Sequence, residues 1–192
     1  MTIKLSHKPF YFIRHGETEW NKNKIIMGRS DIPLNQYGIE QAYQVQKFLR
    51  DISFSEICTS PLKRAYKTAE ILNEAIDCKL TTHDDLVERG FGELEGSPYN
   101  LSLSAITNTE LPMDAESFDA FEIRVLKAME QILQGANTSP LIVAHGGVFV
   151  VLAKHCAGNV DIRAANCQPF LFRPPEHETH PWFICEIGDE EK

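Results

Sequence analysis

A tripeptide near the start of the sequence combines residue types that suit phosphoryl chemistry. Arg14 places a permanent cation beside the imidazole of His15, and Gly16 lets the backbone approach a ligand closely. A neutral imidazole nitrogen can attack phosphorus when the other ring nitrogen is fixed by a hydrogen bond, commonly to a backbone carbonyl. The tripeptide therefore indicates an anion site that contains a nucleophile, although a histidine turn with a salt-bridged arginine has the same composition.

Segments with strand and helix patterns alternate along the chain, and these elements must position the tripeptide. We expect strands at 10–13, 56–59, 79–82, 140–144, 168–172 and 182–187. We expect helices at 35–50, from Ser60, from Ser117, and after His145 through Cys156. This alternation predicts an α/β fold, a three-layer α/β/α sandwich with a mostly parallel mixed sheet of about six strands. Residues 1–192 are expected to form a single domain.

The first strand and the first two helices have the clearest local signals. The run Phe10–Ile13 is apolar without alternation, as in a strand that helices cover on both faces. After it comes a segment rich in Gly, Asn and Asp, which is expected to be a loop. Asn35 is the expected N-cap of the amphipathic helix at 35–50. Ser60 is expected to cap the next helix, with Pro61 in its first turn.

The residues with chemical potential come soon after the expected strands. His15 follows the first strand, Arg64 comes shortly after the second, and His145 follows the strand at 140–144. In open α/β sheets, ligands bind outside the carboxyl ends of the strands. We therefore expect these three side chains to converge on one pocket, although they lie far apart in the sequence.

Four sequence blocks resemble the histidine phosphatase superfamily, the group that contains cofactor-dependent phosphoglycerate mutases and many small phosphatases. In chain order these blocks are FIRHGETEWNKNKIIMGRSDIPLNQYGIEQA, TSPLKRAYKTAEIL, LVERGFGELEG and IVAHGGV. A weaker block, AESFDAFEIRV, is similar to the segment that follows the cap in family members. The resemblance lies between Phe10 and Val148, and beyond it only the closing strands are similar.

The resemblance implies a role for each residue of the predicted pocket. His15 would carry a covalent phosphoryl group, and Arg14, Arg64 and His145 would hold that group. Phosphoryl transfer mainly needs positioning and charge neutralisation at the equatorial oxygens, which two guanidiniums and an imidazole supply without a metal or other cofactor. Asn21 matches a family position that hydrogen-bonds the phosphate, and its NH₂ group suits an oxygen acceptor.

The remaining members of the predicted phosphate- and substrate-binding set are Gly28, Arg29, Arg89 and Gly146. Arg29 has the equal alternative of an arginine in a surface loop. For His145 the alternative is a structural helix cap.

Glu88 in LVERGFGELEG matches the general acid of the family. In family members this carboxyl protonates the leaving oxygen and then activates the water that cleaves the phosphohistidine. The competing carboxylates are Glu17, Glu93 and Glu95, for which the alternative is a structural or solvated role. Asp84 and Asp85 are outside candidates for the acid.

A small cap over the pocket is expected around 92–116, where small and polar residues are frequent. No Lys or Arg occurs from Gly90 to Ile123, whereas mutases of the family have cations there for a second anionic group of the substrate. The cap would be uncharged and partly apolar through Leu94, Tyr99, Leu101, Leu103 and Ile106. We therefore expect a phosphohydrolase for a small phosphomonoester with a neutral leaving part. The alternatives are phosphoglycerate mutase-type transfer and a low-activity regulatory or binding member of the fold.

The composition argues against several other classes of protein. The 192 residues are 43% hydrophobic and 24% charged, and no apolar stretch approaches the roughly 20 residues that cross a bilayer. A net charge of −8 without a run of Lys or Arg disfavours nucleic acid as a partner. The N-terminus lacks the pattern of a signal peptide, so we expect a cytoplasmic monomer or homodimer.

Cysteine and histidine spacing does not indicate a metal site. The five cysteines are scattered and are expected to be reduced thiols. Of the seven histidines, only His177 and His180 are spaced for local chelation. Arg163 and Arg173 lie in the divergent stretch 158–192, where they either complete the pocket or belong to a solvated turn.

Overall fold

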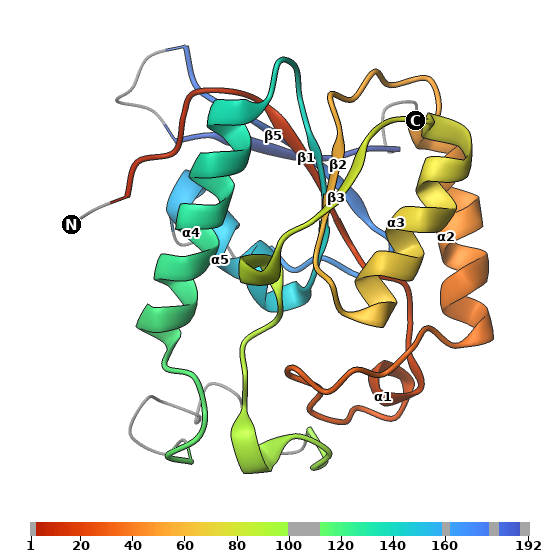
Figure 1. The fold of residues 1–192 in the computed structure, drawn as a ribbon, viewed down its shortest axis with the longest axis vertical. Helices are drawn as coiled ribbons and strands as arrows, with labels where there is room; N and C mark the ends of the chain where they lie inside the picture. Colours follow the sequence, from red (N-terminus) through yellow and green to blue (C-terminus); the bar gives the residue numbers. More distant parts are fainter. Residues whose placement is uncertain (1–2, 100–111, 159–161, 177–180, 189–192) are drawn as a thin grey trace.

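The computed structural model describes residues 3–99, 112–158, 162–176 and 181–188. A six-stranded sheet lies between two helix layers, α2 and α3 on one side and α4 and α5 on the other (Figure 1). The strands are β1 (Phe10–Arg14), β2 (Ile57–Thr59), β3 (Leu80–Thr82), β4 (Leu141–Ala144), β5 (Pro169–Arg173) and β6 (Phe183–Glu186). The helices are α1 (Glu19–Lys22), α2 (Gln36–Leu49), α3 (Lys63–Ile76), α4 (Phe118–Gly135) and α5 (Gly146–Ala157), with 3₁₀ turns η1 (Asp84–Leu86) and η2 (Gly92–Leu94). The predicted α/β/α sandwich is confirmed.

The sheet has the order β3-β2-β4-β1-β5-β6. Its first four strands are mutually parallel, and β5 and β6 add antiparallel pairings at one edge. The prediction of a mostly parallel mixed sheet is therefore confirmed. Because β2, β4 and β1 are neighbours and run in the same direction, their carboxyl ends share one edge of the sheet.

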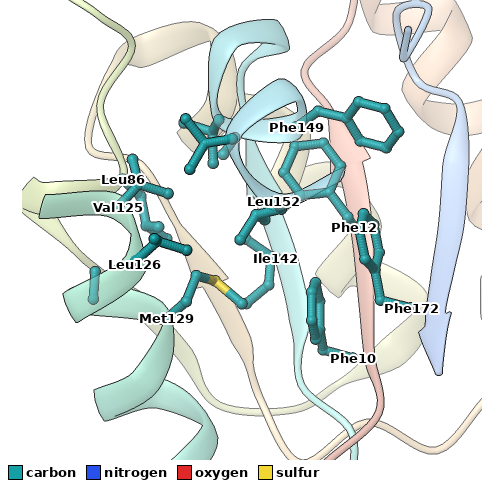
Figure 2. Packing of buried hydrophobic residues seen from close by; sticks show 14 of the residues in the cluster. Phe10, Phe12, Leu86, Val125, Leu126, Met129, Ile142, Phe149, Leu152 and Phe172 are labelled. Carbon is teal, nitrogen blue, oxygen red and sulfur yellow. The ribbon is translucent and has the colours of Figure 1, made fainter. Parts of the chain in front are cut away.

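Alternate residues of the central strands fill two separate cores. Phe10, Phe12 and Ile142 face α4 and α5, where Phe10 stacks on Phe172 with ring centroids 4.6 Å apart (Figure 2). The other face packs against α2 and α3 through Ile13, Ile57, Leu141 and Val143. Burial on both faces explains the apolar runs of these strands. Among the described helices, none combines the length and the apolarity that crossing a bilayer requires.

Two local predictions near the strand ends are wrong. The segment after β1 contains the short helix α1, which Thr18 and Asn21 stabilise by a reciprocal capping box. Ser60 does not cap the helix after β2. This helix, α3, begins at Lys63, and the side chain of its N-cap residue forms no capping hydrogen bond. The Lys63 amide instead donates to Asp31 Oδ1 over 2.7 Å, a cap from another segment. The Asn35 cap of α2 is confirmed, because Asn35 Oδ1 accepts from the Gly38 amide over 2.7 Å.

The expected cap is described only at its two ends. Residues 92–99 contain η2 and lie beside the segment after α1, where Ile25 and Pro98 form a β-bridge. Residues 112–116 lead into α4, whose first turn is capped by Ser117. Leu101, Leu103 and Ile106 lie outside the described residues.

Candidate active site

Three strand ends bring together the side chains that the sequence predicted to converge. His15 directly follows β1, His145 directly follows β4, and Arg64 is the second residue of α3 after β2. The two imidazole rings have centroids 5.2 Å apart. His15, Arg64 and His145 are 3%, 1% and 0% exposed. Arg64 lines the adjoining pocket, whereas the two imidazoles are not among its lining residues.

His15 is held in the form that a nucleophile needs. Its Nδ1 is 2.7 Å from the carbonyl oxygen of Gly16, so Nδ1 carries the proton and donates, and Nε2 keeps its lone pair. Burial lowers the pKa of the His15 imidazole well below 6.5, and the nearby Arg64 and Arg14 guanidiniums lower it further. The ring therefore remains neutral well into the acidic range. Thr68 Oγ1 fixes the backbone beside the ring by accepting from the Gly16 amide over 3.1 Å.

The imidazole of His145 is also buried, and its Nδ1 has no hydrogen-bond partner among the described residues. Its Nε2 lies 2.8 Å from Ser60 Oγ, whereas its Nδ1 is buried and unpaired. Burial also lowers the pKa of His145 well below 6.5, with Arg64 and His15 adding to the effect. A neutral ring that accepts the Ser60 hydroxyl proton at Nε2 carries its own proton on Nδ1, which makes Nδ1 a donor.

The two guanidiniums are fixed by backbone carbonyls and have further donor capacity. Arg64 donates through Nη1 to Ser30 O and through Nη2 to Gly28 O, both over 2.8 Å, and Arg14 donates through Nη1 to Ala164 O over 3.1 Å. The Nε atoms of both arginines are buried without a hydrogen-bond partner among the described residues. Burial lowers the pKa of Arg64 to about 10, so its side chain remains cationic at neutral pH. Buried donors without partners are unusual, and they are expected where an anion binds.

Glu88 is the one carboxylate among the described residues that line this pocket. Its Oε2 accepts from the Gly147 amide and its Oε1 from the Arg89 amide, both over 2.9 Å. Gly147 lies in the first turn of α5, whose amides and dipole favour a negative charge. A Cβ at Gly147 would overlap Glu88 Oε1 and lie 3.2 Å from Phe121 Cε1, so only glycine leaves room for the carboxylate.

Arg124 of α4 holds the backbone that carries Glu88. Its guanidinium donates to the carbonyl oxygens of Asp85 and Val87 over 2.8 Å and of Glu88 over 2.9 Å. The same group forms a two-point pair with Glu116, at 2.7 and 2.8 Å. The Arg124 and Glu116 side chains are only 15% and 13% exposed. This clamp positions Glu88 from a helix on which no catalytic residue was predicted.

Four of the remaining predicted binding residues line the pocket, namely Asn21, Gly28, Gly146 and Arg89. The Asn21 oxygen accepts from Thr18, which leaves its NH₂ group available to an acceptor in the pocket. Gly28 has φ 51°, and a Cβ there would lie 2.6 Å from Glu95 Cδ. Gly146 is the first residue of α5, where a Cβ would only contact Arg14 Nε at 3.6 Å.

The two further arginines have partners in the protein. Arg29 forms an ion pair with Glu116 at 3.1 Å, its side chain is 49% exposed, and it is not among the described residues that line the pocket. Arg89 does line the pocket, but its Nε donates to Glu116 O over 2.8 Å and its guanidinium lies over the rings of Phe91 and Phe118. Direct contact of either arginine with substrate remains a prediction.

Two of the competing carboxylates, Glu95 and Glu17, have structural positions. Burial raises the pKa of Glu95, but the Ser30 hydroxyl and the amides of Arg29, Phe91 and Ser30 donate to this carboxylate and hold its pKa below the ordinary value. Glu17 accepts from Asn35 Nδ2 over 2.9 Å, next to α2. None of the competing carboxylates of the sequence analysis lines the pocket within the described residues.

The pocket above the cluster has a volume of about 1170 Å³ and a mixed lining. Trp20, Phe91, Tyr99 and Phe118 give it apolar walls. Lys24, Lys154 and Arg163 also line it, and they come from segments outside the expected cap. Among the described residues that line the pocket, the expected cap contributes only Tyr99, which is uncharged. No group of three or more His, Cys, Asp or Glu side chains in the described parts of the chain is placed to hold a metal.

Several residues that support the site were not predicted from the sequence. Asn166, in the loop before β5, donates to His15 O over 2.8 Å and to Asn21 Oδ1 over 3.4 Å. Arg124 lies within the weaker block AESFDAFEIRV, which was the one sequence signal available for it. Gly147 was visible in IVAHGGV, but only the position of Glu88 explains why this second glycine is required.

Comparison with known proteins gives consistent results. The sequence model of the histidine phosphatase superfamily (branch 1) matches residues 10–168. The uncharacterized phosphatase PhoE of Bacillus subtilis (strain 168) is 36% identical over 147 residues, which are 76% of each chain. The probable phosphoglycerate mutase GpmB of Erwinia tasmaniensis is 33% identical over 190 residues, 90% of this chain and 86% of the relative. The solved structure of Bacillus stearothermophilus YhfR has a TM-score of 0.80 at 23% identity and covers 96% of this chain and 98% of its own.

These similarities agree with the fold and with the cluster at the strand ends. The structural likeness supports the α/β architecture, and the family match includes His15, Arg64, Glu88 and His145. The sequence relatives of this chain are named as phosphatases and as probable phosphoglycerate mutases. The chain therefore belongs to the histidine phosphatase superfamily, branch 1.

Proposed function

We propose that this protein is a metal-independent phosphomonoesterase that hydrolyses a small phosphorylated metabolite through a phosphohistidine on His15. The observation that carries the proposal is the set of unpaired buried nitrogens on Arg14, Arg64 and His145, gathered beside a neutral imidazole. Two guanidiniums and one imidazole N–H match the charge and the equatorial oxygens of a transferring phosphoryl group. These groups supply the neutralisation that a metal ion provides in other phosphatases.

The first step transfers the phosphoryl group to the enzyme. The lone pair on His15 Nε2 forms a bond to phosphorus while the ester P–O bond breaks. The leaving oxygen takes its proton from the Glu88 carboxyl group, which the Gly147 and Arg89 amides hold in place. The alcohol product then departs.

The second step releases inorganic phosphate. A water molecule attacks phosphorus, the P–N bond breaks, and the electron pair returns to His15 Nε2. The Glu88 carboxylate accepts the proton of that water. Because the pKa of His15 lies well below 6.5, the nucleophile stays neutral at acidic pH, which supports an acid phosphatase type of activity.

The test combines turnover with detection of the intermediate. Hydrolysis of p-nitrophenyl phosphate in the presence of EDTA should persist in the wild type and be lost in His15→Ala. Quenching in alkaline detergent during turnover should trap a base-stable, acid-labile phosphoryl group on the wild-type protein only. Undiminished turnover of His15→Ala would overturn the proposal.

A second candidate is phosphoglycerate mutase-type transfer, which the similarity to the probable phosphoglycerate mutase GpmB favours. Incubation with 3-phosphoglycerate separates the two reactions, because a mutase forms the 2-phosphate isomer and a phosphatase releases inorganic phosphate. A low-activity regulatory or binding protein would show neither reaction and no trapped intermediate.

A further inference from the structure

The carboxylate of Glu95 accepts four hydrogen bonds from two separate segments of the chain. Its Oε1 accepts from the amides of Arg29 and Phe91 over 2.9 and 3.0 Å. Its Oε2 accepts from the amide and the hydroxyl of Ser30 over 2.8 and 2.7 Å. Glu95 is not among the described residues that line the pocket. A carboxylate whose two oxygens are both occupied by donors holds segments together, and here one of those segments is the loop 28–30.

One bond of Glu95 lies opposite a bond of Arg64. The Arg29 amide, which donates to Glu95, and the Gly28 carbonyl belong to one peptide group. That carbonyl accepts from Arg64 Nη2 over 2.8 Å. No peptide bond within the described residues is cis, and the N–H and C=O of a trans peptide group point in opposite directions. The peptide group therefore lies between the carboxylate and the guanidinium, and a rotation of this group would disturb both bonds.

The residues on either side of Arg29 support the same arrangement. Ser30 donates to Glu95 through its amide and its hydroxyl, while its carbonyl accepts from Arg64 Nη1 over 2.8 Å. Gly28 has φ 51°, and a Cβ there would overlap Glu95 Oε1. The lack of a side chain at position 28 therefore lets the carboxylate reach the peptide group that binds Arg64.

The two carbonyls decide the direction of the whole Arg64 guanidinium. The group is planar, so fixing Nη1 and Nη2 also fixes the direction of the Nε–H, which is buried without a partner among the described residues. Burial lowers the pKa of Arg64 to about 10, and the charges of Glu88, Asp31 and Glu95 oppose this effect. Glu95 therefore acts on Arg64 through the shared loop and also through its charge.

We propose that Glu95 is a positioning residue for the phosphoryl site, and that its carboxylate holds the loop 28–30 so that the Arg64 guanidinium is directed at the oxyanion. The proposal rests on the proposed phosphomonoesterase function, in which Arg64 holds the transferring phosphoryl group. Without the carboxylate, the amides of Arg29 and Ser30 lose an acceptor, and the loop that holds Arg64 loosens. The oxyanion should then bind more weakly, although every residue that contacts it is unchanged.

The test is a double-mutant cycle on oxyanion affinity. Tungstate, a tetrahedral dianion like hydrogen phosphate, is titrated calorimetrically into the wild type, Glu95→Gln, Arg64→Met and the double variant. Glutamine has the size of glutamate, but its NH₂ group cannot accept from the loop. The Glu95→Gln substitution should weaken tungstate binding about tenfold in the wild type, as expected for one misaligned charge-assisted contact. The same substitution should change the affinity of Arg64→Met less than about twofold, because the group that Glu95 positions is absent there.

Two further variants separate geometry from charge and from a general effect of substitution. Glu95→Asp keeps the charge but is shorter by one methylene group, so it should also weaken tungstate binding, and only when Arg64 is present. Glu93→Gln is the matched control, because Glu93 is an exposed carboxylate on the same 3₁₀ turn and is not among the described residues that line the pocket. It should retain the wild-type affinity. Thermal unfolding curves set a titration temperature at which all variants are folded.

Three results would overturn the positioning role. They are no binding of tungstate by the wild type, an unchanged affinity in Glu95→Gln, and an equal loss with and without Arg64. A fall in kcat at unchanged tungstate affinity belongs to the second result, and it would mean that Glu95 acts through the Phe91 amide on the segment that carries Glu88.

The cycle needs no turnover, so it separates this proposal from the proposed function. If the two substitutions are coupled in tungstate binding but the wild type does not hydrolyse p-nitrophenyl phosphate, the positioning role stands and the phosphomonoesterase function fails. If the wild type hydrolyses p-nitrophenyl phosphate but the two losses of affinity are additive, the function stands and the positioning role fails.

Discussion

Substitution of one glycine should displace Glu88, the proposed general acid, without changing any charged residue. In Gly147→Ala the new Cβ would overlap Glu88 Oε1 and lie 3.0 Å from Glu88 Cδ and 3.2 Å from Phe121 Cε1. The carboxylate is the end of a flexible side chain, so it moves away at little cost in folding free energy, and its 2.9 Å bond to the Gly147 amide is lost. General acid–base catalysis contributes about 10²- to 10⁴-fold, so kcat should fall about 10²-fold or more. The free energy of unfolding should stay within about 1 kcal/mol of the wild type, since alanine also favours the helix.

The choice of substrate separates the two roles of Glu88. Nitrophenolate leaves without a proton, so phosphorylation of His15 by p-nitrophenyl phosphate should remain fast in Gly147→Ala. Hydrolysis of the phosphohistidine should be slow, because no carboxylate accepts the proton of water. Stopped-flow absorbance should therefore show a burst of one nitrophenolate per active site, whereas an alkyl phosphate should show a large loss of kcat/KM and no burst.

Two control variants test the interpretation of the Gly147→Ala experiment. Gly135→Ala, at the end of α4 with no atom within 4 Å of the new Cβ, controls for the effect of alanine on a helix and should retain wild-type kinetics. Gly146→Ala should lose less activity than Gly147→Ala, because its Cβ meets Arg14 Nε at an ordinary 3.6 Å. If Gly147→Ala keeps kcat within about threefold of the wild type and shows no burst, Glu88 is not the proton donor and acceptor.

Two further predictions concern the supports of the site and its ionisation. Arg124→Met removes the clamp on the Glu88 backbone, so kcat should fall more than KM rises, and urea denaturation should show a loss of about 3 kcal/mol. Arg124→Lys should recover little activity because an ammonium cannot form the same fork, and wild-type kcat in Arg124→Met would contradict the clamp. His15 and His145 have pKa values well below 6.5 when folded, so the unfolded state takes up more protons below that pH. The free energy of unfolding should therefore fall as the pH drops below about 6.5, by up to about 2.7 kcal/mol per pH unit for the two residues, and the slope should be shallower in a variant with glutamine at both positions.

The sequence alone determined the elements and the chemical type of the site. Strand and helix patterns depend on local periodicity, which is why β1, α2 and β4 lie close to their predicted bounds. The convergence of His15 and His145 also followed from the sequence, because parallel strands place their carboxyl ends at one edge. The chemistry of a residue that forms a covalent bond or carries a permanent charge can be recognised from its residue type.

Only the tertiary structure decided which residues support these groups and which charges surround them. Asn166 and Asp31 act through contacts with segments distant in sequence, so no local pattern predicted them. For Arg124 the block AESFDAFEIRV was a sequence signal, but only the structure shows its contact with the Glu88 backbone. For the same reason, Lys24 and Lys154 were not predicted to line the pocket. Lys24 and Arg163 lie in separate loops, and only the packing of those loops places both cations at one pocket. A charge acts through space, whereas a sequence pattern records only neighbours along the chain.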